Sequence, residues 1–155
     1  MTPTIVRHQM KYALLILAAA LAGTALAAEI ERINPAGMTQ PTGYTYLVKH
    51  GDTLYIAGQV GLDGDGNIVG EGDIAAQFRQ AMENLKIILA SEGADFSDVV
   101  KTTIYTTSIA EFRKTAAIRA EYFGGQAPAN TLVQIERLAR LVFMVEIEAI
   151  AITHD

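Results

Sequence analysis

The chain has 155 residues, of which half are hydrophobic and 19% are charged, and its formal net charge is −5. This length suits one domain with a buried core. An acidic chain lacks the positive footprint that nucleic acid requires, so we expect no nucleic-acid partner. The sequence contains no cysteine, which excludes a disulfide framework, a thiolate nucleophile and a cysteine-based zinc site.

Residues 1–27 have the pattern of a secretory signal peptide. Arg7 and Lys11 give a positive start, an apolar run follows from Tyr12, and Ala25-Leu26-Ala27 places small residues where a signal peptidase needs them. An uncleaved anchor is the alternative, although the apolar run is short for a span of about 30 Å of hydrocarbon. We therefore predict cleavage after Ala27 and a periplasmic or secreted chain of residues 28–155 without stable membrane association.

The mature chain begins with a polar segment, residues 28–43, for which we predict irregular structure with one short strand near Ile30 to Ile33. The folded domain is predicted over residues 44–155. Residues 44–50 and 53–60 are rich in β-forming side chains and flank a Gly-Asp pair, which predicts a hairpin. The glycine-rich residues 61–67 predict a turn, followed by a short strand at 68–69.

From Asp73 the hydrophobic residues recur every three or four positions, which predicts a helix that Asp73 caps and Gly93 ends. Residues 99–106 read as a strand. Ser108 and Glu111 have the spacing of a capping box, which predicts a second helix through Phe123. Two further strands are predicted over residues 131–136 and 141–153.

This order, ββ(β)αβαββ, predicts an α+β domain with a five- to six-stranded mixed sheet and two helices on one face. Both faces of the last predicted strand are mostly apolar, so both should be covered. Two helices cover only one face. Burial against further copies of the chain is the simplest solution, and we therefore expect an oligomer.

Glu146 and Glu148 are the candidate chemical groups on that strand. They alternate along it and so share a face, which the pattern also assigns to Val142, Met144 and Ile150. A carboxylate on an apolar face is costly unless it is paired, and burial raises its pKa. The pair therefore indicates a general acid–base or water-orienting group in an interface pocket, an ion pair across that interface, or an acid near a sheet edge.

The sequence offers little support for a metal or a cofactor. Asp63, Asp65 and Asn67 imitate the start of a calcium loop, but Ile68 and Ile74 occupy its glycine and glutamate positions. We interpret this segment as a solvated turn and predict no metal. Phosphate-binding and dinucleotide-binding glycine patterns are also lacking, so nucleotide binding is not predicted.

From about Tyr44 onward the chain resembles the Rid (YjgF) family. Four segments carry the resemblance, in the family's order and spacing: TLYIAGQVGLDGDGNIVG, DIAAQFRQAMENLKIILASEGADFSDVVKTTIYTT, PANTLVQIERL and VEIEAIAI. The resemblance implies a chorismate-mutase-like subunit that forms a homotrimer with a central barrel and three clefts between subunits. Active members hydrolyse reactive enamines and imines in these clefts to keto compounds and ammonia, without a cofactor.

The resemblance also implies site residues. Tyr44 matches a cleft tyrosine, Gly58 a glycine whose backbone faces the ligand, and Glu146 the glutamate that positions or activates water. Leu132 occupies the position where many members have a cysteine that makes a backbone contact. Asn130 stands where the family has an arginine that clamps the substrate carboxylate, and losing that charge-assisted pair should cost about 2–4 kcal/mol. The roles of Arg137 and Arg140, which lie near the last hairpin, stay open at this point.

The sequence therefore predicts a RidA-like enamine/imine deaminase, with weak or shifted substrate range because of Asn130. A homotrimer that binds a small molecule in the same inter-subunit clefts, without turnover, is the alternative. A scaffold role would need a large exposed apolar surface.

Overall fold

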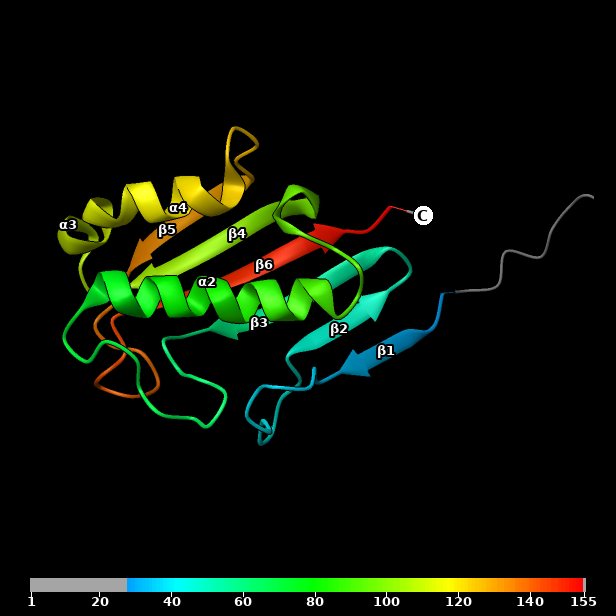
Figure 1. The fold of residues 1–155 in the computed structure, drawn as a ribbon, viewed down its shortest axis with the longest axis horizontal. Coiled ribbons are helices and arrows are strands. Elements are labelled where there is room, and N and C mark those ends of the chain that lie inside the picture. Colours follow the sequence, from blue (N-terminus) through cyan, green and yellow to red (C-terminus); the bar gives the residue numbers. More distant parts are fainter. Residues whose placement is uncertain (1–27, 155) are drawn as a thin grey trace, which may run out of the picture.

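The computed structural model describes residues 28–154, which form a six-stranded sheet with its helices on one face (Figure 1). The strands lie in the order β1-β2-β3-β6-β4-β5, and every neighbouring pair is antiparallel except β4 and β5. The predicted signal peptide lies outside the described residues. The elements are β1 Ile30–Ile33, β2 Leu47–His50, β3 Thr53–Gln59, α2 Ile74–Ala90, β4 Val99–Thr106, α3 Ile109–Phe112, α4 Ala116–Phe123, β5 Ala129–Gln134 and β6 Val145–Ile152.

Helix α2 supplies the centre of the core because its apolar stripe follows the 3.6-residue period. The Asp73 carboxylate accepts hydrogen bonds from the first-turn backbone, and Gly93 follows the end of the helix with a φ of 71°. Both ends confirm the prediction. The stripe packs on β3 and β6, and its buried members are Ile74, Phe78, Ala81, Met82, Leu85, Ile88 and Leu89.

The second predicted helix is not continuous. It consists of α3 and α4, separated by a turn of 3₁₀ helix over Arg113–Thr115. Ser108 caps α3 as expected, but the Glu111 carboxylate pairs with Lys114 at 2.8 Å instead of completing a capping box. The Thr115 hydroxyl donates to the Phe112 carbonyl at 2.7 Å, which satisfies the backbone at the break.

The predicted first and last segments also need correction. The lead-in contributes β1, which pairs with β2 and confirms the short strand near Ile30. Residues 68–69 form no strand, only an isolated bridge between Leu62 and Ile68. Strand β6 starts at Val145 rather than at residue 141, so Val142 and Met144 precede the strand instead of sharing a sheet face with Glu146.

Gln77 explains why β6 starts late. Its buried side-chain amide donates to the Val142 carbonyl at 2.8 Å and to the Gly70 carbonyl at 3.1 Å, and its oxygen accepts from the Met144 N–H at 2.8 Å. These bonds satisfy backbone groups that would otherwise enter the sheet ladder. Gln77 thereby fixes the turn that leads into Glu146.

We expect Gln77→Leu to lower the free energy of unfolding by about 2–4 kcal/mol, because it leaves three backbone groups without their partner. Urea unfolding at a fixed protein concentration measures the loss. Gln80→Leu on the same helix is the control, because its amide contacts only the Asn84 side chain. Equal losses in the two variants would contradict the role given to Gln77.

Within residues 28–154, no helix is long and apolar enough to cross a membrane. The helices cover the face of the sheet that carries the buried residues of β3, β4 and β6. The opposite face, called the open face below, is covered by no element of the described chain. It exposes Tyr55 by 48% and Ile152 by 39%.

Candidate functional site

The open face gathers the polar groups of the central strands. Glu146 and Glu148 point outward from β6 as predicted, and the strand register places Tyr105 of β4 opposite Glu146 and Thr103 opposite Glu148. On the other side of β6, Tyr55 of β3 lies opposite Ile150. Cross-strand neighbours of this kind have Cβ atoms about 5 Å apart. Two carboxylates and two phenols therefore share a partly buried surface.

Gly58 lies beneath the Glu146 carboxylate. Strand β3 has a bulge between Ile56 and Gln59, which adds one residue opposite β6. A Cβ atom at position 58 would overlap the carboxylate of Glu146. Only glycine allows this close approach, because it has no side chain. The bulge and the glycine together leave the space that the Glu146 carboxylate occupies.

Tyr44 completes this cluster from the loop before β2. Its ring stands edge-on to Tyr46, with centroids 5.6 Å apart. Desolvation, the neighbouring Tyr46 hydroxyl and the negative charge of Glu146 together raise the pKa of Tyr44 to about 12. Tyr44 therefore remains a neutral hydrogen-bond donor at physiological pH. The structure thus brings together three of the predicted site residues, Tyr44, Gly58 and Glu146.

Glu146 has the electrostatics of a proton-transfer group. Its side chain is partly buried, and burial, followed by the charge of Glu148, raises the pKa of its carboxyl group. Neither acid takes part in an ion pair among residues 28–154. This absence concerns one chain only, so the ion pair across an interface and the acid–base group both stay predictions, and the raised pKa suits the second.

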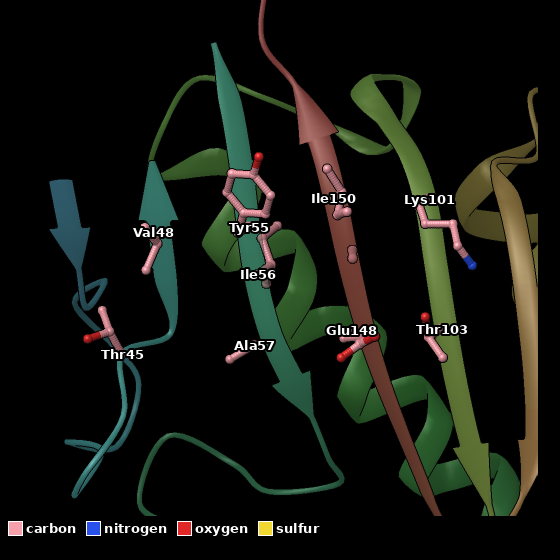
Figure 2. Close-up of a pocket in the computed structure, with 10 residues that line it drawn as sticks. Thr45, Val48, Tyr55, Ile56, Ala57, Lys101, Thr103, Glu148 and Ile150 are labelled. Atoms are coloured by element: carbon pink, nitrogen blue, oxygen red, sulfur yellow. The ribbon is translucent and has the colours of Figure 1, made fainter. Parts of the chain in front are cut away.

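A concavity of about 420 Å³ adjoins the cluster on the open face (Figure 2). Glu148 and Thr103 lie next to each other in its floor, and Tyr55 borders it. Lys101 also lines it, but its ammonium group donates to the Thr102 carbonyl at 2.9 Å and the Thr131 hydroxyl at 2.7 Å. Figure 2 shows this lysine directed toward β5, so it does not neutralise Glu148.

Asn130 and Leu132 lie away from this cluster. Asn130 is opposite Thr102 of β4, whose hydroxyl donates to the Asn130 side-chain oxygen at 2.9 Å. Thr102 is buried on the helix-covered face, so Asn130 faces that side. Leu132, two residues on, packs against the hydrophobic core. One chain therefore places the five predicted residues on opposite faces of its sheet, and a site that uses all of them requires two chains.

Tyr105 and Thr103 were not singled out from the sequence. The sequence shows that they alternate along one face of β4. Only the pairing of β4 with β6 places them beside Glu146 and Glu148. The structure also shows where Arg137 and Arg140 lie. Arg140 lies over the Phe143 ring, 5.0 Å from its centroid, and Arg137 is exposed. Neither belongs to the cluster around Glu146.

The glycine-rich turn behaves as a solvated loop. The Asp63 carboxylate accepts hydrogen bonds from the backbone of Asp65 and Asn67 and from the Asn67 side chain, at 2.9–3.2 Å. These bonds lower the pKa of Asp63, with Asn67 the main cause. Its oxygens therefore serve the turn itself. Over residues 28–154, no group of three His, Cys, Asp or Glu side chains is placed to hold a metal ion.

Glu146→Gln should make the protein more stable than the wild type at about pH 7.5, and by less at about pH 4. The pKa of Glu146 is raised in the folded chain, so the folded state holds the proton more tightly than the unfolded state. Wild-type stability then falls as the pH rises from the ordinary glutamate pKa through the raised one. Glutamine carries no such cost. Urea unfolding at both pH values is the measurement, and a difference independent of pH would contradict the shift.

The chain is similar to known proteins over most of its length. A family model described as Endoribonuclease L-PSP matches residues 37–153. A RutC family protein of Pyrococcus horikoshii is 42% identical over 113 residues, 72% of this chain and 89% of that protein. The 2-iminobutanoate/2-iminopropanoate deaminase of Mus musculus is 39% identical over 109 residues, 70% of this chain and 80% of that protein.

A solved structure gives the same result for the fold. The Rid family protein YyfA of Yersinia pestis matches with a TM-score of 0.75 at 31% identity, over 81% of this chain and all of that one. The chain therefore belongs to the Rid (YjgF) family and has its chorismate-mutase-like α+β fold.

Proposed function

We propose that this protein is a RidA-like deaminase that hydrolyses reactive 2-imino acids and their enamine tautomers to keto acids and ammonia. The observation that carries the proposal is the position of Glu146, a partly buried carboxyl group of raised pKa seated over Gly58 and close to Tyr44. The relatives named as 2-iminobutanoate/2-iminopropanoate deaminases give the reaction class.

The site is a cleft between two copies of the chain. Tyr44, Gly58 and Glu146 belong to the open face of one copy, whereas Asn130 and Leu132 belong to the β5 edge of the next. This arrangement accounts for both the uncovered apolar face and the separation of the five residues. A homotrimer with three such clefts closes the assembly without leaving an open face. If residues 1–27 act as a signal peptide, the reaction takes place outside the cytoplasm.

The chemistry needs one group that both accepts and returns a proton. The Glu146 carboxylate accepts a proton from water as the water oxygen bonds to the carbon of the protonated imine, which gives a carbinolamine. The carboxyl group then returns this proton to the amino nitrogen. The C–N bond breaks as the carbonyl forms and ammonia leaves, while the Glu146 carboxylate accepts the hydroxyl proton of the carbinolamine and passes it to the departing ammonia to give ammonium. Tyr44, neutral because of its high pKa, donates a hydrogen bond within the same cleft.

Asn130 weakens the binding of substrates through their carboxylate group. Its side-chain oxygen already accepts from Thr102, so only its amide hydrogens remain for a ligand. A neutral amide holds a carboxylate less firmly than a guanidinium group does. We therefore propose weak activity on 2-iminopropanoate, the smallest substrate. The same observation favours the alternative, a homotrimer that binds a small molecule in these clefts without turnover.

The test is the release of ammonia and keto acid from freshly generated 2-iminopropanoate by residues 28–155, compared with the buffer rate. Light scattering on the same sample gives the oligomeric state. Hydrolysis above the buffer rate by a trimer supports the proposal. A trimer without turnover that gains thermal stability with a keto acid supports the binding alternative instead.

A further inference from the structure

A second concavity, of about 420 Å³, lies on the helix-covered side of the molecule, between α3, α4 and β5. Figure 1 shows α4 running beside β5 at this edge of the sheet. Its walls are largely apolar, with Phe112 and Phe123 from the helices and Leu132 from β5. Alanines 116, 120 and 127 leave the space between these larger side chains. A branched aliphatic or aromatic side chain fits within this volume and suits its lining.

The charged residues that line this pocket are two arginines, Arg113 and Arg119, in a chain with a net charge of −5. Neither forms an ion pair with an acid among residues 28–154, whereas the nearby Arg79 and Lys114 are paired with Glu121 and Glu111. The two guanidinium groups are therefore available to an anion. A carboxylate is the planar anion that a guanidinium binds with two parallel hydrogen bonds.

Arg119 is the better placed of the two. It is partly buried, while Arg113 is exposed. Its guanidinium carbon lies 5.9 Å from the centroid of the Phe123 ring, which forms a wall of the pocket. An arginine held against an aromatic ring loses less side-chain entropy on binding than a free one.

The pocket also lies beside the position of the missing arginine. Asn130 and Leu132 are two residues apart on the same face of β5, about 7 Å along the strand. Leu132 lines the pocket, so Asn130 lies next to it. The position that the family resemblance assigns to a carboxylate-binding arginine and the pocket with the two unpaired arginines are thus neighbours.

We propose that Arg119 binds the substrate carboxylate in place of the missing arginine, and that the adjoining pocket holds an apolar side chain of the substrate. The inference rests on the proposed function and narrows its substrate class to 2-imino acids with a branched aliphatic or aromatic side chain. Arg119 and the pocket act as specificity determinants, while Glu146 of the neighbouring copy carries the proton transfer.

The test uses the full mature chain and two keto-acid products as probes, 4-methyl-2-oxopentanoate and pyruvate, with dissociation constants from calorimetry. We expect the wild type to bind the branched acid more tightly than pyruvate. Arg119→Gln should weaken its binding about ten- to a hundred-fold, since one charge-assisted pair is lost. Ala120→Leu narrows the pocket and should weaken binding of the branched acid but not of pyruvate. Arg32→Gln, which removes an exposed arginine of β1, is the charge-matched control.

The outcomes separate this inference from the proposed function because binding is measured without turnover. If Arg119→Gln binds the branched acid as tightly as Arg32→Gln does, the inference is wrong even when the protein hydrolyses imines. If Arg119→Gln and Ala120→Leu have the expected effects but no turnover is seen, the inference on the ligand holds and the hydrolase proposal fails. A change of oligomeric state in Arg119→Gln without a change in affinity would assign the pocket to the contact between copies and overturn the inference.

Discussion

Glu146→Gln should lower kcat/KM for the hydrolysis of 2-iminopropanoate by about a hundred-fold or more, the usual contribution of a general acid–base group. Glutamine has nearly the same size and fits over Gly58, but it can neither accept the proton of water nor return it to nitrogen. The loss should fall mainly on kcat, because the substrate still enters the cleft. Ammonia release under saturating substrate measures it.

Glu148→Gln is the matched control, on the same strand and face. It removes a charge that raises the pKa of Glu146. We therefore expect it to retain catalysis and to shift the acid limb of the pH–rate profile to lower pH. Equal losses of kcat in the two variants, with no shift of the profile, would show that the open face needs both acids for its structure and would contradict the role given to Glu146.

Asn130→Arg should raise kcat/KM for 2-iminopropanoate by about ten- to a hundred-fold, because it adds a charge-assisted pair to the substrate carboxylate beside the one proposed for Arg119. This substrate lacks the apolar side chain that the pocket beside Arg119 would hold, so the gain should be larger for it than for a branched imine. Asn130 is exposed on the edge strand, and the longer side chain therefore meets no packing conflict in its own chain.

Asn130→Gln is the control for this variant, because it lengthens the side chain without adding charge. We expect no gain from it. If Asn130→Arg is no better than Asn130→Gln, position 130 does not face the substrate carboxylate. The correspondence with the family's arginine would then be wrong for this chain.

Much of the fold could be predicted because the signals are local. The stripe of α2 follows the helical period and its ends carry recognisable caps. The alternation along β6 predicted that Glu146 and Glu148 share a face, and the apolar character of both faces predicted the uncovered side of the sheet. These inferences depend on residues close together in sequence.

The remaining features depend on contacts between distant residues. The start of β6 is set by Gln77, which lies in another element, and no periodicity in residues 141–144 reveals that contact. The break between α3 and α4 follows from the Thr115 side chain binding backbone in place of the next helical turn. Asn130 faces away from Glu146 because β5 pairs in parallel with β4, a register that a short edge strand does not specify. Without that register, the residues themselves gave no ground to propose a site shared between two chains.

The most direct test of the shared cleft is the activity of mixed oligomers. One chain carries Asn130→Arg together with Glu146→Gln, and the other carries Asn130→Asp. Each chain alone should be inactive on 2-iminopropanoate, the first for want of Glu146 and the second because an added carboxylate repels that of the substrate. In co-expressed oligomers, some clefts combine the intact Glu146 of the second chain with the Asn130→Arg substitution of the first chain. These clefts should recover hydrolysis. Co-expressed chains no more active than the separate ones would contradict a site built from two copies.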